Sequence, residues 1–169
     1  MEAVALIFKY NQEEYVKAVR WHLFACRTIT KRDLHVLAVG FSLSALYQIF
    51  ISFSLASALI FVSLALPAIP IGMMYFYLPV NTYKRTAELQ EEHTYVFTIN
   101  GITVEASGTQ TEIEWETYRD LWESDEFYFL MKTVRKFTII PKRAFGSTEE
   151  KEWFEKFAMI NMGMSRRLQ

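Results

Sequence analysis

The hydrophobic pattern of the chain is dominated by fifty consecutive residues, Leu34 to Tyr83, that include no Asp, Glu, Lys or Arg. A helix needs about 20 apolar residues to cross the ~30 Å hydrocarbon layer of a bilayer. The run is therefore long enough for two crossings and too short for three. We predict a transmembrane hairpin at residues 34–80, with antiparallel helices at about 34–53 and 55–77.

Basic residues flank this hairpin at both ends. Arg27, Lys31 and Arg32 precede the first helix, Lys84 and Arg85 follow the second, and the turn between the helices has none. Because basic residues are retained on the cytoplasmic side of a membrane, both termini are predicted to be cytoplasmic. The alternative is a helical hairpin buried in a soluble domain. It would require about 120 other residues to wrap two wholly apolar helices, so the membrane interpretation is favoured.

The segment before the hairpin, residues 1–33, is predicted to be a cytoplasmic arm. Val4 to Phe8 has the composition of a strand, and residues 12–30 have the pattern of an amphipathic helix. Asn11 is the expected N-cap of this helix, with Glu14 completing a weak capping box. The sequence leaves open whether residues 4–8 join the sheet formed by the C-terminal segment.

From residue 84 to residue 169 the pattern changes to alternation of apolar and polar residues, which indicates β-strands. We predict strands at residues 94–99, 102–107, 109–115, 127–132 and 136–140. The Asn100-Gly101 dipeptide is predicted to form a type I′ hairpin turn. The acidic run from Asp120 to Glu126 lacks the ligand spacing of a calcium loop and is interpreted as a solvated turn.

A C-terminal helix is predicted after these strands, because Ser147 and Glu150 form a capping box. Several antiparallel strands followed by one helix are typical of a pleckstrin-homology-like (PH-like) barrel. The predicted fold class is therefore an α+β membrane protein. It combines a two-helix transmembrane hairpin with a cytoplasmic PH-like antiparallel β-barrel, which the C-terminal helix caps.

Composition and charge exclude several classes of function. The net charge of −1 argues against a nucleic-acid partner, and Cys26 as the only cysteine excludes an internal disulfide. His22 and Cys26 have a spacing that metal ligands use, but too few other His or Cys residues exist to complete a site. No convergent set of titratable groups is apparent, so we predict no enzymatic activity, no metal and no cofactor.

The sharpest candidate site is a basic cluster around the last strand pair. Its members are Lys132, Arg135, Lys136, Lys142 and Arg143. Basic side chains around one hairpin suit the headgroups of anionic lipids or an acidic protein partner. The alternative is the ordinary solvated surface of a barrel.

Several segments resemble the bacterial YcxB-like proteins. The resemblance rests on FKYNQEEYVKAVRWH, YVFTINGITVE, TEIEW, EKEWFEKF and above all FTIIPKRAF. It implies an N-terminal arm, two membrane helices and a PH-like C-terminal domain in the bacterial inner membrane. It implies no active site, because the family has no established catalytic activity.

Two functions are compatible with these features. The first is a membrane-anchored, non-enzymatic interaction or scaffold module, which contacts membrane lipids and an unknown protein partner or a second copy of itself. The second is a membrane immunity protein that neutralises a toxin acting at the inner membrane.

Overall fold

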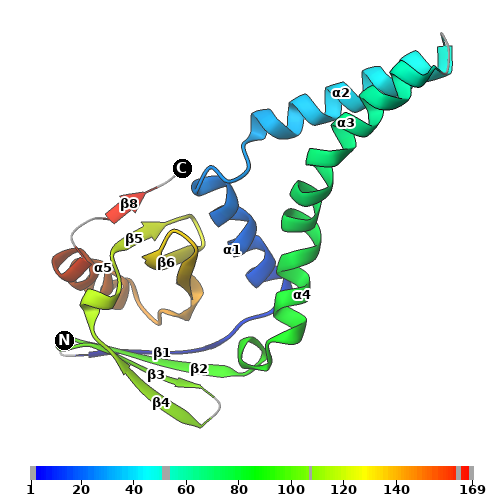
Figure 1. Cartoon of the computed structure of the whole chain (residues 1–169). Helices are drawn as coiled ribbons and strands as arrows, with labels where there is room; N and C mark the ends of the chain where they lie inside the picture. Colours follow the sequence, from blue (N-terminus) through cyan, green and yellow to red (C-terminus); the bar gives the residue numbers. More distant parts are fainter. Residues whose placement is uncertain (1–2, 51–53, 107, 163–164, 168–169) are drawn as a thin grey trace. The chain divides into compact units, whose positions relative to one another are not determined.

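The protein divides into two compact units (Figure 1). The computed structural model describes residues 3–50, 54–106, 108–162 and 165–167. The first unit consists of Met1–Glu14 and Thr86–Gln169, and the second consists of Tyr15–Arg85. The second unit is therefore an insertion within the sequence of the first.

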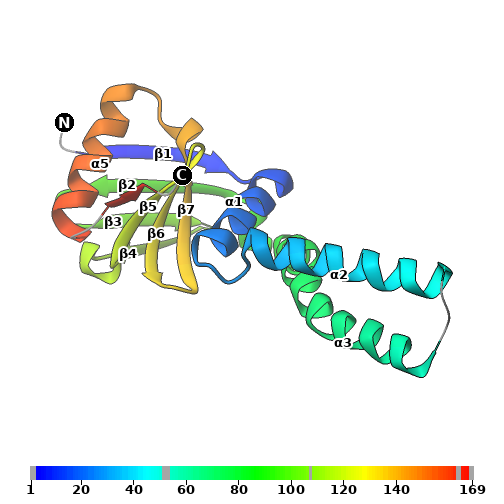
Figure 2. The same ribbon diagram turned by 90° about the horizontal axis from the view of Figure 1, so that it is seen from above.

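The first unit contains all the strands among the described residues. Its elements are β1 (Ala3–Lys9), η2 (Ala87–Gln90), β2 (Glu92–Thr98), β3 (Ile102–Ala106), β4 (Thr109–Ile113), η3 (Trp115–Thr117), β5 (Asp120–Glu123), β6 (Phe127–Thr133), β7 (Lys136–Pro141), η4 (Lys142–Ala144), α5 (Thr148–Met162) and β8 (Ser165–Arg167). Sheet A has the strand order β1-β2-β3-β4, and sheet B has the order β7-β6-β5-β8 (Figure 2). All neighbouring pairs are antiparallel except β5 and β8, which are parallel.

The closed barrel predicted from the sequence is not formed by the described strands, which make two separate sheets. The chain turns away from sheet A at η3, where the buried Trp115 donates a hydrogen bond from Nε1 to the carbonyl oxygen of Thr98 (2.9 Å). After this turn β5 pairs with β6 and β8, so β4 remains an edge strand.

β1 is a full member of sheet A and settles the question that the sequence left open. It pairs antiparallel with β2 along its whole length, from Ala3 opposite Thr98 to Lys9 opposite Glu92. Its side chains alternate between exposed and buried, as expected for a strand with one face on a core. The chain between these two neighbouring strands contains the entire second unit.

The core of the first unit is largely aromatic. Phe97 of β2 contacts Trp115 and Phe154, and Phe154 of α5 also contacts Tyr128 of β6, with ring centroids 4.9–5.9 Å apart. The helix α5 therefore joins the two sheets through one fully buried side chain. Its predicted N-cap is confirmed, because the Glu150 amide donates to the Ser147 hydroxyl (3.2 Å).

Two details of the strand prediction are wrong. The Asn100-Gly101 pair does not form a type I′ turn, because that turn needs positive φ at both residues and neither residue has it. The pairing of Phe97 with Ile102 instead centres the turn on residues 99 and 100. This register keeps Phe97 and Ile102 on the buried face.

The predicted acidic turn at Asp120–Glu126 is the second error, because its first four residues form β5. The sequence D-L-W-E is too short to show a clear alternation. Leu121 is nonetheless buried at 1% exposure, and the pairing of β5 with β6 positions it.

The second unit is helical. Its elements are α1 (Gln12–Ala25, whose first three residues belong to the first unit), α2 (Lys31–Phe50), α3 (Leu55–Gly72), the π-helical η1 (Met73–Tyr77) and α4 (Leu78–Arg85). The segments Lys31–Phe50 and Ala58–Arg85 are each long and apolar enough to cross a membrane. The predicted turn at residues 52–54 lies mostly outside the described residues, which resume at Ser54.

α2 and α3 pack against each other, as the predicted hairpin requires. A Cβ added at Gly40 would lie 3.1 Å from a methyl group of Leu64, and the rings of Phe41 and Phe61 meet edge to face. The helix α2 begins at Lys31, three residues before the predicted start, because Thr30 and Asp33 cap it. The Thr30 hydroxyl donates to the Asp33 carboxylate (2.6 Å) and accepts from the Asp33 amide (3.2 Å).

Candidate functional site

The structure separates the predicted basic cluster into two groups. Lys132, Arg135 and Lys136 surround the β6–β7 turn, whereas Lys142 and Arg143 follow the other end of β7 in η4. A strand rises about 3.3 Å per residue, so the backbone ends of this six-residue strand are about 17 Å apart. The five residues therefore do not form one patch.

The group at the β6–β7 turn is solvent-accessible. Arg135 and Lys136 are exposed, and Val134 between Thr133 and Arg135 is 63% exposed. The Thr133 hydroxyl accepts hydrogen bonds from the amides of Arg135 (3.3 Å) and Lys136 (3.1 Å), which shapes the turn. Lys132 is half-buried, with its ammonium 5.0 Å from the centre of the Tyr118 ring. An exposed apolar residue among basic side chains suits an anionic, partly apolar surface.

Lys142 is an internal ion-pair partner and not part of a surface patch. Its ammonium lies 2.7 Å from a carboxylate oxygen of Glu123 on β5 and 4.8 Å from the centre of the Tyr128 ring. The side chains of Lys142 and Glu123 are only 12% and 19% exposed. The pair thus links η4 to sheet B.

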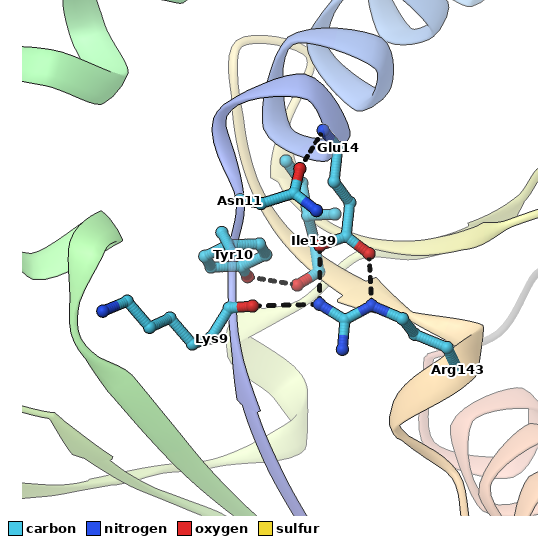
Figure 3. A network of polar contacts seen from close by, with 6 residues as sticks. All are labelled: Lys9, Tyr10, Asn11, Glu14, Ile139 and Arg143. Carbon is cyan, nitrogen blue, oxygen red and sulfur yellow. Dashed lines mark hydrogen bonds and ion pairs between the residues drawn. The ribbon is translucent and has the colours of Figure 1, made fainter.

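Arg143 binds the N-terminal arm (Figure 3). Its Nε and Nη2 donate to the two carboxylate oxygens of Glu14, both at 2.7 Å, and Nη2 also donates to the carbonyl oxygen of Lys9 at 2.9 Å. The hydrogen bond to the Glu14 carboxylate raises the pKa of the Arg143 guanidinium above its ordinary value. This forked geometry is the strong form of an Arg–carboxylate pair.

Two further hydrogen bonds fix the arm beside Arg143. The Tyr10 hydroxyl donates to the carbonyl oxygen of Ile139, and the Asn11 side-chain oxygen accepts from the Glu14 amide at 2.7 Å (Figure 3). Asn11 is therefore the N-cap of α1, as predicted. The Glu14 carboxylate binds Arg143, which lies far away in the sequence and was not part of the predicted capping box.

No local sequence pattern indicates the contact between Glu14 and Arg143, because 129 residues separate them. The P-K-R part of FTIIPKRAF was predicted to be a surface site. Lys142 and Arg143 instead hold elements of the first unit together through their ion pairs. Of the predicted basic cluster, only the residues at the β6–β7 turn remain as a candidate contact surface.

His93 is a buried titratable group that sequence analysis did not single out. It is 7% exposed and lies among the rings of Phe8, Tyr10 and Tyr95. Neither ring nitrogen has a hydrogen-bond partner of good geometry among the described residues. Burial therefore lowers the pKa of the His93 imidazole, although nearby Glu88 partly opposes this effect.

This burial predicts a specific pH dependence. The unfolded state binds a proton near the ordinary pKa of about 6.5, and the folded state resists it, so stability is lost as pH falls below 6.5. We expect His93→Phe to remove that loss, which amounts to at most about 1.4 kcal/mol per pH unit. The free energy of unfolding of the detergent-solubilised protein, measured at pH 7.5 and at pH 5.5, gives the size of this loss. His35→Phe, at an exposed position, is the control and should leave the loss in place. A wild-type and a His93→Phe protein with equal pH dependence would contradict it.

The basic residues that flank the hairpin lie at or beside the ends of its helices. Lys31 and Arg32 are in the first turn of α2, Lys84 and Arg85 end α4, and Arg27 lies between α1 and α2. All five side chains are exposed. The rings of Tyr15 and Tyr83, near the two ends of the second unit, are 5.8 Å apart.

A comparison with protein families identifies part of the first unit. Residues 97–158 match the YcxB-like protein family. The family recognised from the sequence is thus confirmed for this YcxB-like segment, which runs from within β2 into α5 and includes Arg143. The segment excludes β1, which pairs with β2, and Glu14, which binds Arg143. No curated protein and no solved structure gave a significant match.

Proposed function

We propose that this chain is a membrane-anchored, non-enzymatic interaction module with a PH-like domain at the cytoplasmic face of the bacterial inner membrane. The observation that carries the proposal is that the α2–α3 hairpin is inserted in the sequence between β1 and β2, which pair directly with each other in sheet A. The chain leaves the first unit after β1, forms the proposed membrane anchor, and returns to the first unit at β2. The anchor is therefore connected to the domain at both of its ends.

The surface of the hairpin supports the membrane part of the proposal. Ile49, Phe50 and Leu55 are 74–79% exposed, and large apolar side chains are exposed along both helices. Exposed apolar surface of this extent is unfavourable in water and is matched by a hydrocarbon environment. The hydroxyls of Ser42 and Ser63 donate to carbonyl oxygens within their own helices, which satisfies them without water.

The topology of sheet A supports the placement of both flanks on one side. Lys9 and Glu92 are paired neighbours in the sheet, and the hairpin begins and ends beyond them. An open sheet cannot lie across the hydrocarbon layer, so the hairpin must leave and return on the same side. The exposed basic flanks favour the cytoplasmic side.

The two sheets followed by α5 support a PH-like assignment, and such a domain is an assembly module in this proposal. The exposed turn formed by Lys132, Arg135 and Lys136 is its proposed contact with anionic lipid or an acidic partner. Lys142 and Arg143 do not belong to this contact, because their ion pairs hold η4 to β5 and to the N-terminal arm.

Labelling of single cysteines tests the topology. In a Cys26→Ser background, Ala5→Cys, Thr109→Cys and Leu55→Cys occupy exposed positions in β1, β4 and at the start of α3. We expect a membrane-impermeant thiol reagent to reach residues 5 and 109 from the cytoplasmic side and residue 55 from the opposite side. Labelling of residues 5 and 109 from opposite sides, or of all three from one side, would overturn the proposal.

A further inference from the structure

β4 forms one edge of sheet A (Figure 1), and the opposite edge strand, β1, is contacted by Arg143 of η4. Thr109, Gln110, Thr111 and Glu112 are all exposed, and only the last residue, Ile113, is partly covered. An edge strand presents backbone N–H and C=O groups without a ladder partner, and extended peptides bind to such edges by adding a strand.

The surface around this edge is acidic. Residues 102–118, which form β3, β4 and the turn after them, contain four Glu residues and no Asp, Lys or Arg. Thr103 pairs with Glu112 and Glu105 pairs with Gln110, which places Glu105 and Glu112 on the same face of the β3–β4 ladder. Within the described part of the chain, neither carboxylate has an ion-pair partner.

A hollow of about 590 Å³ lies beside the same edge. Its lining residues are Thr98, Asn100, Gly101, Ile102, Thr103, Glu112, Ile113 and Glu114. Gly101 brings the β2–β3 turn close to the end of β4, since a Cβ at this position would lie 3.1 Å from the carbonyl oxygen of Ile113. The hollow thus combines a free sheet edge with two exposed carboxylates.

We infer that the β4 edge binds an extended segment of another protein that carries Lys or Arg at alternate positions. The backbone of this segment pairs with β4, and its basic side chains, which share one face because of the two-residue period, meet Glu105, Glu112 and Glu114. One of them enters the hollow between Glu112 and Glu114. This assignment rests on the proposed role as an interaction module and names the chemistry of its partner.

Charge decides between a foreign segment and a second copy of this chain. A second β4, paired antiparallel along its whole length, would place Glu112 opposite Gln110 and diagonal to the other Glu112, so the carboxylates of both copies would share one face and repel each other. A basic segment neutralises these carboxylates instead. The foreign basic strand is therefore the favoured occupant.

The test uses the full chain in a non-ionic detergent and a fluorescent peptide, Lys-Thr-Lys-Val-Lys-Thr-Lys-Val. We expect the peptide to bind and to slow hydrogen exchange of the β4 amides. Glu112→Gln with Glu114→Gln should weaken binding about tenfold, as expected for the loss of two exposed ion pairs. The matched control, Glu149→Gln with Glu152→Gln at exposed positions of α5, should leave binding unchanged.

Two peptides separate strand addition from simple charge attraction. N-methylation of two adjacent backbone nitrogens in the middle of the peptide removes one donor from each edge of its strand, whichever edge faces β4, and replacement of all Lys by Glu reverses the charge. Equal binding of the N-methylated peptide, binding of the Glu peptide, or no change in β4 exchange would overturn the inference. Self-association of the chain through β4 would also overturn the inference. Loss of this self-association in Glu112→Gln would show that it uses the β4 edge. The detergent assay does not depend on membrane orientation, so its failure is distinguishable from failure of the labelling test.

Discussion

Leu6→Asp is expected to unfold the first unit, whereas Ala5→Asp one residue earlier leaves it folded. Leu6 is completely buried in β1, and Ala5 is exposed on the opposite face of the same strand. Removal of a buried Leu side chain costs about 3–5 kcal/mol, and burial of a carboxyl group without a partner adds to it. The sum approaches the whole stability of a typical domain, 5–15 kcal/mol.

The measurement is hydrogen exchange of the detergent-solubilised protein, read at β2 and β3. Loss of β1 removes the partner of every residue of β2 on one side. We therefore expect Leu6→Asp to abolish protection of residues 92–106, and Ala5→Asp to change the opening free energy by no more than about 1 kcal/mol. Full protection of β2 in Leu6→Asp would show that β1 is dispensable for the first unit.

The same strand shows where prediction from sequence was limited. The strand character of residues 4–8 was evident from their composition, but its partner was not, because the second unit separates β1 from β2 in sequence. Local patterns define elements, whereas pairing depends on contacts between distant segments. The two packed helices of the hairpin and the cap of α5 were predicted correctly because charge-free runs and capping boxes are local signals.

The errors follow the same division. The four residues of β5 are too few to show a period, and the strand exists because β6 and β8 lie beside it. The type I′ turn at Asn100-Gly101 was a sound local prediction, but burial of Phe97 opposite Ile102 determined the register. The basic cluster was defined by sequence proximity, and a six-residue strand, β7, divides it.

Arg143→Ala is expected to release the N-terminal arm from η4 and to lower the free energy of β1 opening by about 2 kcal/mol. The substitution removes the forked bond to Glu14 and leaves the carboxylate of Glu14, 12% exposed, without this cation. It also removes the donor to the Lys9 carbonyl oxygen. The Arg143 side chain is 53% exposed, so solvent screening keeps the cost below that of a buried pair.

A double-mutant cycle isolates the pair. We expect Glu14→Ala and Arg143→Ala together to cost about 1–2 kcal/mol less than the sum of the two single changes, because each already removes the same interaction. Arg143→Lys should recover less than half of the loss, since an ammonium cannot reproduce the fork. Arg135→Ala, at an exposed position of the β6–β7 turn, is the control and should change stability by less than about 0.5 kcal/mol.

The readout is exchange of the β1 amides, because local opening of an arm is detected there before global unfolding. In Arg143→Ala, faster exchange of residues 3–9 with unchanged exchange of β6 would show that Arg143 acts on the arm. Additive costs in the cycle would show that Glu14 and Arg143 do not stabilise each other. The N-terminal arm would then be held by the β1–β2 ladder, the Tyr10 hydroxyl, the packing of Phe8 and the Arg143 bond to the Lys9 carbonyl oxygen.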